Sequence, residues 1–143
     1  TVAALVNAGI PVMGHLGFTP QSVNTIGGFR VQGREEDGRE RLITEAKRLE
    51  DAGAFSVVLE LVPGAVAEAV TAAVEIPTIG IGAGVGCDGQ ILVLHDMLGL
   101  NTGFKPRFLK RFAELAEAAE SGVREYVREV RAREYPAPEH TFE

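Results

Sequence analysis

The residue best suited to do chemistry in this sequence is Glu60, which is the only charge in the apolar run 55–63. The run is short and rich in Val and Leu, which predicts a buried strand. Side chains alternate across a strand, so Glu60 shares a face with Val58 and Val62. Loss of solvent there would raise the pKa of the carboxyl above the ordinary value of about 4.3 and make it a candidate general base. A structural carboxylate satisfied at the strand end by a backbone donor, an arginine or water is equally open.

His15 is the second candidate. It lies near the end of an expected strand over residues 9–17, where Met13 and Gly17 share its face and leave room beside it. A neutral imidazole in that place could donate a hydrogen bond to a substrate oxygen. The alternative is a core histidine bonded to a backbone carbonyl.

Three further features could take part in binding or catalysis. The glycines of residues 80–84 do not match the dinucleotide fingerprint, because the turn leads to another strand rather than a helix; they either admit a ligand to the backbone or relieve crowding. Cys87 is interpreted as a turn residue. His95 and Asp96 are neighbours and would face opposite sides of a strand, so they are interpreted as structural. No metal-ligand spacing of His, Cys, Asp or Glu is found.

The elements that must position these residues alternate between strands and helices. A helix end is expected at residues 1–9 and a long loop, of the kind that forms active-site lids, at 18–37. This alternation predicts an α/β fold with a parallel sheet, in which reactive groups lie at the carboxyl ends of strands. The expected strands are 9–17, 55–63, 76–84 and 90–96, and the expected helices are 38–52, 65–74, 107–119 and 122–133.

Composition narrows the class of protein. The 143 residues are 45% hydrophobic and 24% charged, which is typical of a soluble globular domain. The net charge of −6 and the mixing of basic residues with carboxylates argue against nucleic acid as a partner. No run is long enough to span a bilayer and Cys87 is the single cysteine, so we expect a reducing cytoplasm and no membrane. The chain lacks an initiator Met and opens within a helix, which indicates a piece of a longer chain.

Ordered blocks across all 143 residues closely resemble the ketopantoate hydroxymethyltransferase family, in which they correspond to the second half of the protein. The blocks are residues 14–22, 27–34, 59–63, 79–84, 87–90, 95–96, 135–136 and 139–140. The resemblance implies a (βα)₈ TIM barrel of the phosphoenolpyruvate/pyruvate type, a homodecamer and a need for Mg²⁺. It implies transfer of a hydroxymethyl group from 5,10-methylenetetrahydrofolate to α-ketoisovalerate, giving ketopantoate for pantothenate biosynthesis.

Carried over by motif, Glu60 matches the family's general base and His15 matches a histidine that contacts the keto acid. Residues 18–34 match a segment near the active-site mouth. The family's metal-binding aspartates and a substrate-binding lysine belong to its first half. Residues 1–143 are therefore expected to be the C-terminal half of a single barrel domain, with no metal ligand of their own and activity only with the N-terminal half.

Two alternatives stay open. Related barrels cleave or rearrange bonds in other oxo-acids, so the chain could belong to a lyase or mutase of the same type. It could also be a non-catalytic fragment or assembly subunit whose helices bury an oligomer interface. Half a barrel alone leaves two open strand edges, so its other half must come from elsewhere.

Overall fold

The computed structural model describes residues 1–26, 28, 30–103 and 105–142. Two positions of the expected loop, Gly27 and Phe29, lie outside the described residues. The chain divides into two compact units, Thr1–Ile91 and Leu92–Glu143. The first unit holds the sheet and both candidate residues, and the second is helical and irregular.

The first unit is built on a four-stranded parallel sheet. Its strands follow the order β1-β2-β3-β4. The strands are β1 (Met13–Gly17), β2 (Ser56–Glu60), β3 (Thr78–Ile81) and β4 (Gly89–Gln90). Gly17 pairs with Glu60 and Glu60 pairs with Ile81, so the first three strands end at one level. The predicted α/β class with a parallel sheet is confirmed.

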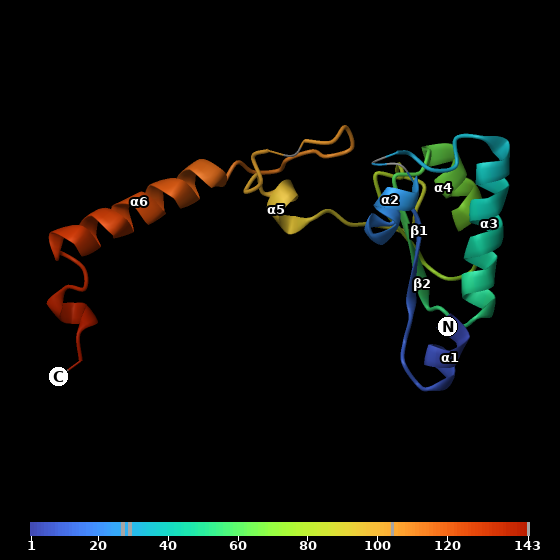
Figure 1. Ribbon diagram of the computed structural model, residues 1–143, viewed down its shortest axis with the longest axis horizontal. Coiled ribbons are helices and arrows are strands. Elements are labelled where there is room, and N and C mark those ends of the chain that lie inside the picture. Colours follow the sequence, from blue (N-terminus) through green and yellow to red (C-terminus); the bar gives the residue numbers. More distant parts are fainter. Residues whose placement is uncertain (27, 29, 104, 143) are drawn as a thin grey trace. The chain divides into compact units, whose positions relative to one another are not determined.

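Helices α3 (Glu36–Asp51) and α4 (Gly64–Thr71) lie side by side on one face of the sheet, and the shorter α1 (Val2–Asn7) precedes β1 (Figure 1). α3 carries acidic residues in its first turn and Arg48 in its last, which complements the helix dipole. The core between these helices and the sheet is aliphatic, and burial of such side chains is the main stabilising term. Its buried members are Leu42, Ala46, Val57, Leu59, Val62, Val66, Ala67, Val70 and Ala83.

The opposite face of the sheet is not fully covered within the first unit. It carries His15, Val58 and Glu60, all of intermediate exposure, and Met13, which is exposed. In a parallel barrel one face of each strand packs against the helices and the other against the remaining strands. This arrangement of the described residues is consistent with half of a barrel, in which the open face would pack against further strands.

The prediction of a loop over residues 18–37 is wrong in part. The described residues of this segment include the 3₁₀ turn η1 (Pro20–Ser22) and the one-turn helix α2 (Val23–Ile26), and α3 begins at Glu36. One turn of helix is too short to produce an apolar period. Pro20 at the first position of the 3₁₀ turn is the local signal, since its fixed φ suits a helix start.

The expected fourth strand over residues 90–96 is also wrong beyond its first residue. β4 ends at Gln90, and residues 94–97 form the helical turn α5 (Leu94–Met97). A short apolar run fits a strand and a helix equally well. Strand pairing determines where β4 ends, because only Ile79 and Gly80 of β3 pair with β4.

In the described part of the second unit, one long helix is found where two were expected, at 107–119 and 122–133. α6 (Ala116–Ala132) runs through Gly122, and η2 (Pro138–His140) follows it. A glycine inside a helix costs only about 1 kcal/mol relative to alanine, so it does not end the helix. Salt bridges of Arg124 with Glu120 and of Arg128 with Glu125 link successive turns. No described helix is long and apolar enough to cross a bilayer.

Candidate active site

The structure brings the two candidate residues together. Nε2 of His15 lies 3.1 Å from Oε2 of Glu60, and the two side chains are 32% and 18% exposed. Both lie on the face of the sheet opposite α3 and α4, at the carboxyl ends of adjacent strands. Within the described part of the chain, Nε2 is buried and has no hydrogen-bond partner of normal geometry, so the contact is a close electrostatic pairing.

The environment of Glu60 shifts its proton affinity. Burial raises the pKa of its carboxyl above the ordinary range, and the charge and close contact of His15 act in the opposite direction. The carboxyl therefore binds a proton more tightly than an exposed glutamate does. This is the direction expected of a general base.

The backbone around Glu60 is held on both sides. Its carbonyl accepts a hydrogen bond from the Phe18 N–H at 2.8 Å, and the Leu61 N–H donates to Ile81 at 3.0 Å. Leu61 has a φ of 50°, in the left-handed region that a leucine rarely adopts. Such strain costs of order 1–3 kcal/mol and is concentrated at functional sites. No residue type at position 61 signals it, so sequence reasoning missed it.

Gly17 allows the two strands to end close together. It has a φ of 88°, and a Cβ built on it would lie 2.2 Å from the carbonyl oxygen of Glu60. Any side chain at this position would collide with backbone rather than with the end of a flexible group. Glycine at 17 is therefore required by the approach of β1 to Glu60.

The glycine-rich turn after β3 relieves crowding. Gly82 and Gly84 have φ values of 65° and 78°, and a Cβ on Gly84 would lie 3.0 Å from Cα of Gly64 at the start of α4. The turn thus packs backbone against backbone. Of the two explanations that the sequence left open, the structure supplies evidence for crowding.

Cys87 and Asp88 belong to the loop between β3 and β4. Cys87 is half-buried, and burial raises the pKa of its thiol, which disfavours the nucleophilic thiolate. Oδ2 of Asp88 accepts hydrogen bonds from the Thr78 N–H at 2.8 Å and from the Thr78 hydroxyl at 3.0 Å. These contacts hold the loop against β3, a role that sequence reasoning missed.

His95 and Asp96 do not lie at a strand end, contrary to the expectation. Both belong to α5 in the second unit. Oδ1 of Asp96 accepts a hydrogen bond from Nδ2 of Asn101 at 2.9 Å, and the His95 carbonyl accepts from the Leu100 N–H at 2.8 Å. These local contacts fit a structural role.

The described residues do not provide a metal site. No group of three His, Cys, Asp or Glu side chains within them is close enough to hold an ion. Of His15 and Glu60, only Glu60 offers the oxygen ligand that magnesium prefers, so the other ligands of its octahedral shell would have to come from outside this pair.

Comparison with known proteins places the chain in a family. A family model described as ketopantoate hydroxymethyltransferase matches residues 1–138. The chain is 58% identical over 142 residues to a protein of Ruegeria sp. (strain TM1040), covering 99% of this chain and 50% of that relative. It is 62% identical over 141 residues to one of Nitratidesulfovibrio vulgaris (strain DP4), covering 99% of this chain and 46% of the relative.

A protein of Paracoccus denitrificans (strain Pd 1222) is 56% identical over 142 residues, which cover 99% of this chain and 51% of the relative. All three relatives carry the name 3-methyl-2-oxobutanoate hydroxymethyltransferase. The chain spans about half the length of these curated relatives. The matched family model and the relatives together show that the chain belongs to the ketopantoate hydroxymethyltransferase family.

Proposed function

We propose that a protein containing this chain transfers a hydroxymethyl group from 5,10-methylenetetrahydrofolate to α-ketoisovalerate, giving ketopantoate. The names of the relatives support this reaction class. The observation in the structure that carries the proposal is the 3.1 Å approach of His15 to Glu60 where two parallel strands end.

Glu60 is the proposed general base. A carbon acid next to a ketone is far too weak to lose its proton to an ordinary carboxylate in water. A base whose proton affinity is raised by burial is better matched to this task. The C3–H bond breaks, the proton passes to the Glu60 carboxylate and the electron pair forms the enolate. Its C3 attacks the methylene carbon of the donor, and the two carbon–nitrogen bonds of that carbon are replaced by the new bond to C3 and by the hydroxyl of a water molecule. Tetrahydrofolate leaves, and its two nitrogens take up the proton released from C3 and the remaining proton of the water.

His15 is the proposed contact to the keto acid. Its Nε2 atom is buried and, among the described residues, has no well-aligned hydrogen-bond partner. A substrate oxygen placed beside Glu60 would satisfy this donor. The imidazole thus orients the substrate so that its C3 proton meets the carboxylate.

Magnesium belongs to the proposal as a group held outside this chain. When bound to the keto oxygen, it would supply the positive charge that an enolate needs. The proposal also includes an N-terminal half of the barrel, which would cover the open sheet face, and a homodecameric assembly. We also propose that the protein is located in the cytoplasm.

The test is exchange of the C3 proton of α-ketoisovalerate with deuterium, followed by NMR in a full-length protein that carries this chain. Glu60→Gln should slow exchange by about 10²- to 10⁴-fold, the usual effect of losing a general base. Glu75→Gln is the matched control, because Glu75 is an exposed carboxylate before the start of β3. Wild-type exchange in Glu60→Gln would reject the base assignment.

A second readout separates the competing oxo-acid chemistries. The wild-type protein should consume 5,10-methylenetetrahydrofolate in step with formation of ketopantoate. Deuterium exchange without any folate-dependent transfer would favour a lyase or mutase of the same barrel type. Neither exchange nor transfer would favour the non-catalytic assembly subunit.

A further inference from the structure

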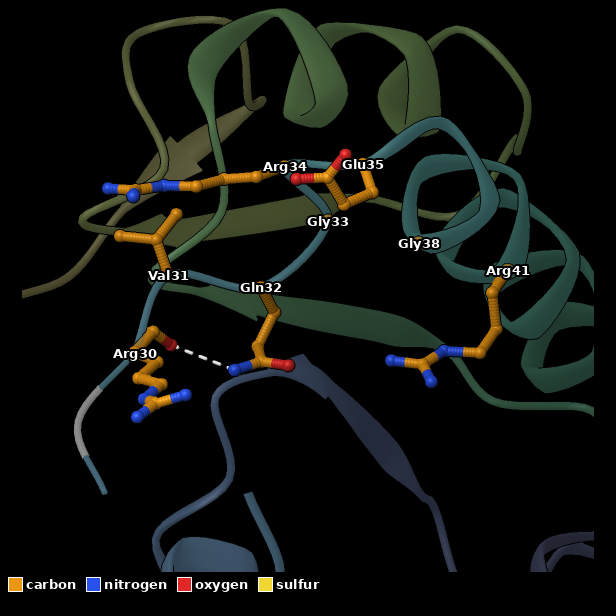
Figure 2. A pocket seen from close by; sticks show the side chains of 8 residues that line it. All are labelled: Arg30, Val31, Gln32, Gly33, Arg34, Glu35, Gly38 and Arg41. Atoms are coloured by element: carbon orange, nitrogen blue, oxygen red, sulfur yellow. Dashed lines mark hydrogen bonds between the residues drawn. The ribbon is translucent and has the colours of Figure 1, made fainter. Parts of the chain in front are cut away.

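A pocket of about 670 Å³ lies next to the candidate active site. It is lined by residues 30–35 together with Gly38 and Arg41 of α3 (Figure 2). The Gln32 N–H donates to the carbonyl of Leu61 at 2.9 Å, so the pocket wall is bonded to the residue that follows Glu60. Glu60 itself is not among the lining residues, and the pocket is therefore a neighbouring site rather than the same one.

The pocket is positively charged although the chain has a net charge of −6. Its lining contains Arg30, Arg34 and Arg41 against a single carboxylate, Glu35. Within the described residues, Arg30 and Arg34 form no salt bridge. Arg41 has one long contact, 3.7 Å from its Nε to Oε1 of Glu45. The positive charge is thus left largely unneutralised.

Two of the arginines lie on either side of the Gln32 side chain. Figure 2 shows Arg41 extending from α3 toward the Gln32 amide and Arg30 on the other side of Gln32, while Arg34 extends away from Arg41 over Val31. Nε2 of Gln32 donates to the Arg30 carbonyl at 2.9 Å, which ties the amide to the backbone beside Arg30. A guanidinium binds a carboxylate through two parallel hydrogen bonds, so this arrangement suits a ligand that carries more than one carboxylate.

The two substrates of the proposed reaction differ in how far their carboxylates lie from the reacting carbon. In α-ketoisovalerate the carboxylate is attached to the keto carbon, so it must stay beside His15 and Glu60. In the folate donor a p-aminobenzoyl spacer separates the one-carbon unit from a glutamate with two carboxylates. Only the donor can react near Glu60 and place carboxylates in a separate, neighbouring pocket.

We infer that the pocket formed by Arg30, Gln32 and Arg41 binds the glutamate tail of the folate donor. The inference rests on the proposed function, because it assumes a folate donor. It assigns no step of proton transfer to these residues. Their role is to hold the donor by its tail while its one-carbon unit reaches the enolate.

The test compares two donors in a full-length protein that carries this chain. One donor is 5,10-methylenetetrahydrofolate, and the other is its analogue that ends at the p-aminobenzoate and lacks glutamate. The double variant Arg30→Gln/Arg41→Gln should raise the KM for the glutamate-containing donor roughly 10- to 100-fold, the effect of losing charge-assisted hydrogen bonds. Its KM for the shorter donor should equal that of the wild type.

Two further measurements show whether the effect of the double variant is specific to the donor. Deuterium exchange at C3 of α-ketoisovalerate, measured without folate, and the KM for the keto acid should both be unchanged in the double variant. Arg39→Gln is the matched control, because Arg39 lies on the same helix, outside the pocket, paired with Glu36 at 3.0 Å. Competition by p-aminobenzoylglutamate, measured as inhibition, should weaken in the double variant and not in Arg39→Gln.

Three outcomes would overturn the inference. An unchanged KM for the glutamate-containing donor would show that the pocket does not bind the donor. An equal rise for both donors would show that the arginines do not contact the tail. Loss of deuterium exchange would assign them to support of Glu60. Failure of the proposed function itself is distinguishable, because the wild-type protein would then show no folate-dependent transfer.

Discussion

Nε2 of His15 lies 3.1 Å from Oε2 of Glu60, although 44 residues lie between them in the sequence. Parallel pairing of β1 with β2 produces this contact, since His15 lies opposite Val58, two residues before Glu60 on the same face. The charge of His15 therefore acts on the carboxyl of Glu60.

Removal of His15 should move the pH dependence of proton abstraction. His15 lowers the pKa of Glu60 against the larger effect of burial, which raises it. In His15→Gln the Glu60 pKa should rise further, so the fall of the exchange rate on acidification should begin at a higher pH than in the wild type. Deuterium exchange measured across the pH range of the folded protein checks this. A profile that stays in place or moves to lower pH contradicts it.

The same variant should bind the keto acid less well. Loss of one hydrogen bond to a charged or strongly polar partner corresponds to roughly a 10-fold rise in KM for α-ketoisovalerate, with a smaller change in the exchange rate at saturation. Steady-state exchange kinetics separate the two quantities. An unchanged KM would argue that His15 does not contact substrate.

Glu60→Gln should stabilise the fold at neutral pH. A carboxyl whose pKa is raised on folding binds its proton more tightly in the folded state, so its ionisation destabilises the fold. That cost is absent below the unfolded pKa and grows as the pH rises through the folded pKa. The Tm of Glu60→Gln should therefore exceed that of the wild type at neutral pH, and the difference should shrink in acid.

Thermal unfolding at both pH values measures this difference, with Glu75→Gln as the control carboxylate. A variant that is less stable than the wild type at neutral pH would show that the contact with His15 outweighs the cost of burial. It would also weaken the physical case for Glu60 as a base with raised proton affinity.

Gly17→Ala should disrupt both stability and proton abstraction. The new Cβ would meet the Glu60 carbonyl oxygen at 2.2 Å, and a φ of 88° is strained for alanine. The left-handed backbone alone costs of order 1–3 kcal/mol, and the collision must push β1 away from Glu60. Urea unfolding and deuterium exchange should both report the change.

Gly14→Ala is the matched control for Gly17→Ala. Its Cβ would meet Cδ1 of Leu49 at 2.6 Å, which is the end of a flexible side chain, and its φ is not in the left-handed region. It should lose stability while it keeps exchange. Equal loss of exchange in both variants would contradict the role given to Gly17.

Thr78→Val should loosen the loop between β3 and β4. Thr78 is fully buried, and its hydroxyl lies 3.0 Å from Oδ2 of Asp88 and 2.8 Å from the Thr71 hydroxyl. Valine keeps the shape and removes the hydroxyl from its partners, Thr71, which is half-buried, and Asp88, which is exposed, and the loss of such hydrogen bonds costs about 0.5–1.5 kcal/mol each. Urea unfolding measures the loss. Thr78→Ser keeps the hydroxyl and should lose less, and an equal loss would point to packing rather than hydrogen bonding.

Elements with a strong apolar period were predictable from the sequence. Helix α3 and strand β2 fall close to their expected positions, because burial against a core imposes a period of 3.6 or 2. The predictions were wrong where a segment is too short to show a period, or where its apolar pattern fits both a helix and a strand. The turns η1 and α2 are too short to show one, and residues 91–96 form an apolar run that fits two structures.

By itself, the sequence determined which side chains share a face within one strand, and so marked His15 and Glu60 as candidates beside their aliphatic neighbours. Only the tertiary structure decided their 3.1 Å contact, the left-handed backbone of Leu61 and the placing of Arg30 near Arg41. The physical reason is that alternation along a strand is local. Strand register and the path of the 30–35 segment depend instead on hydrogen bonds between residues far apart in the chain.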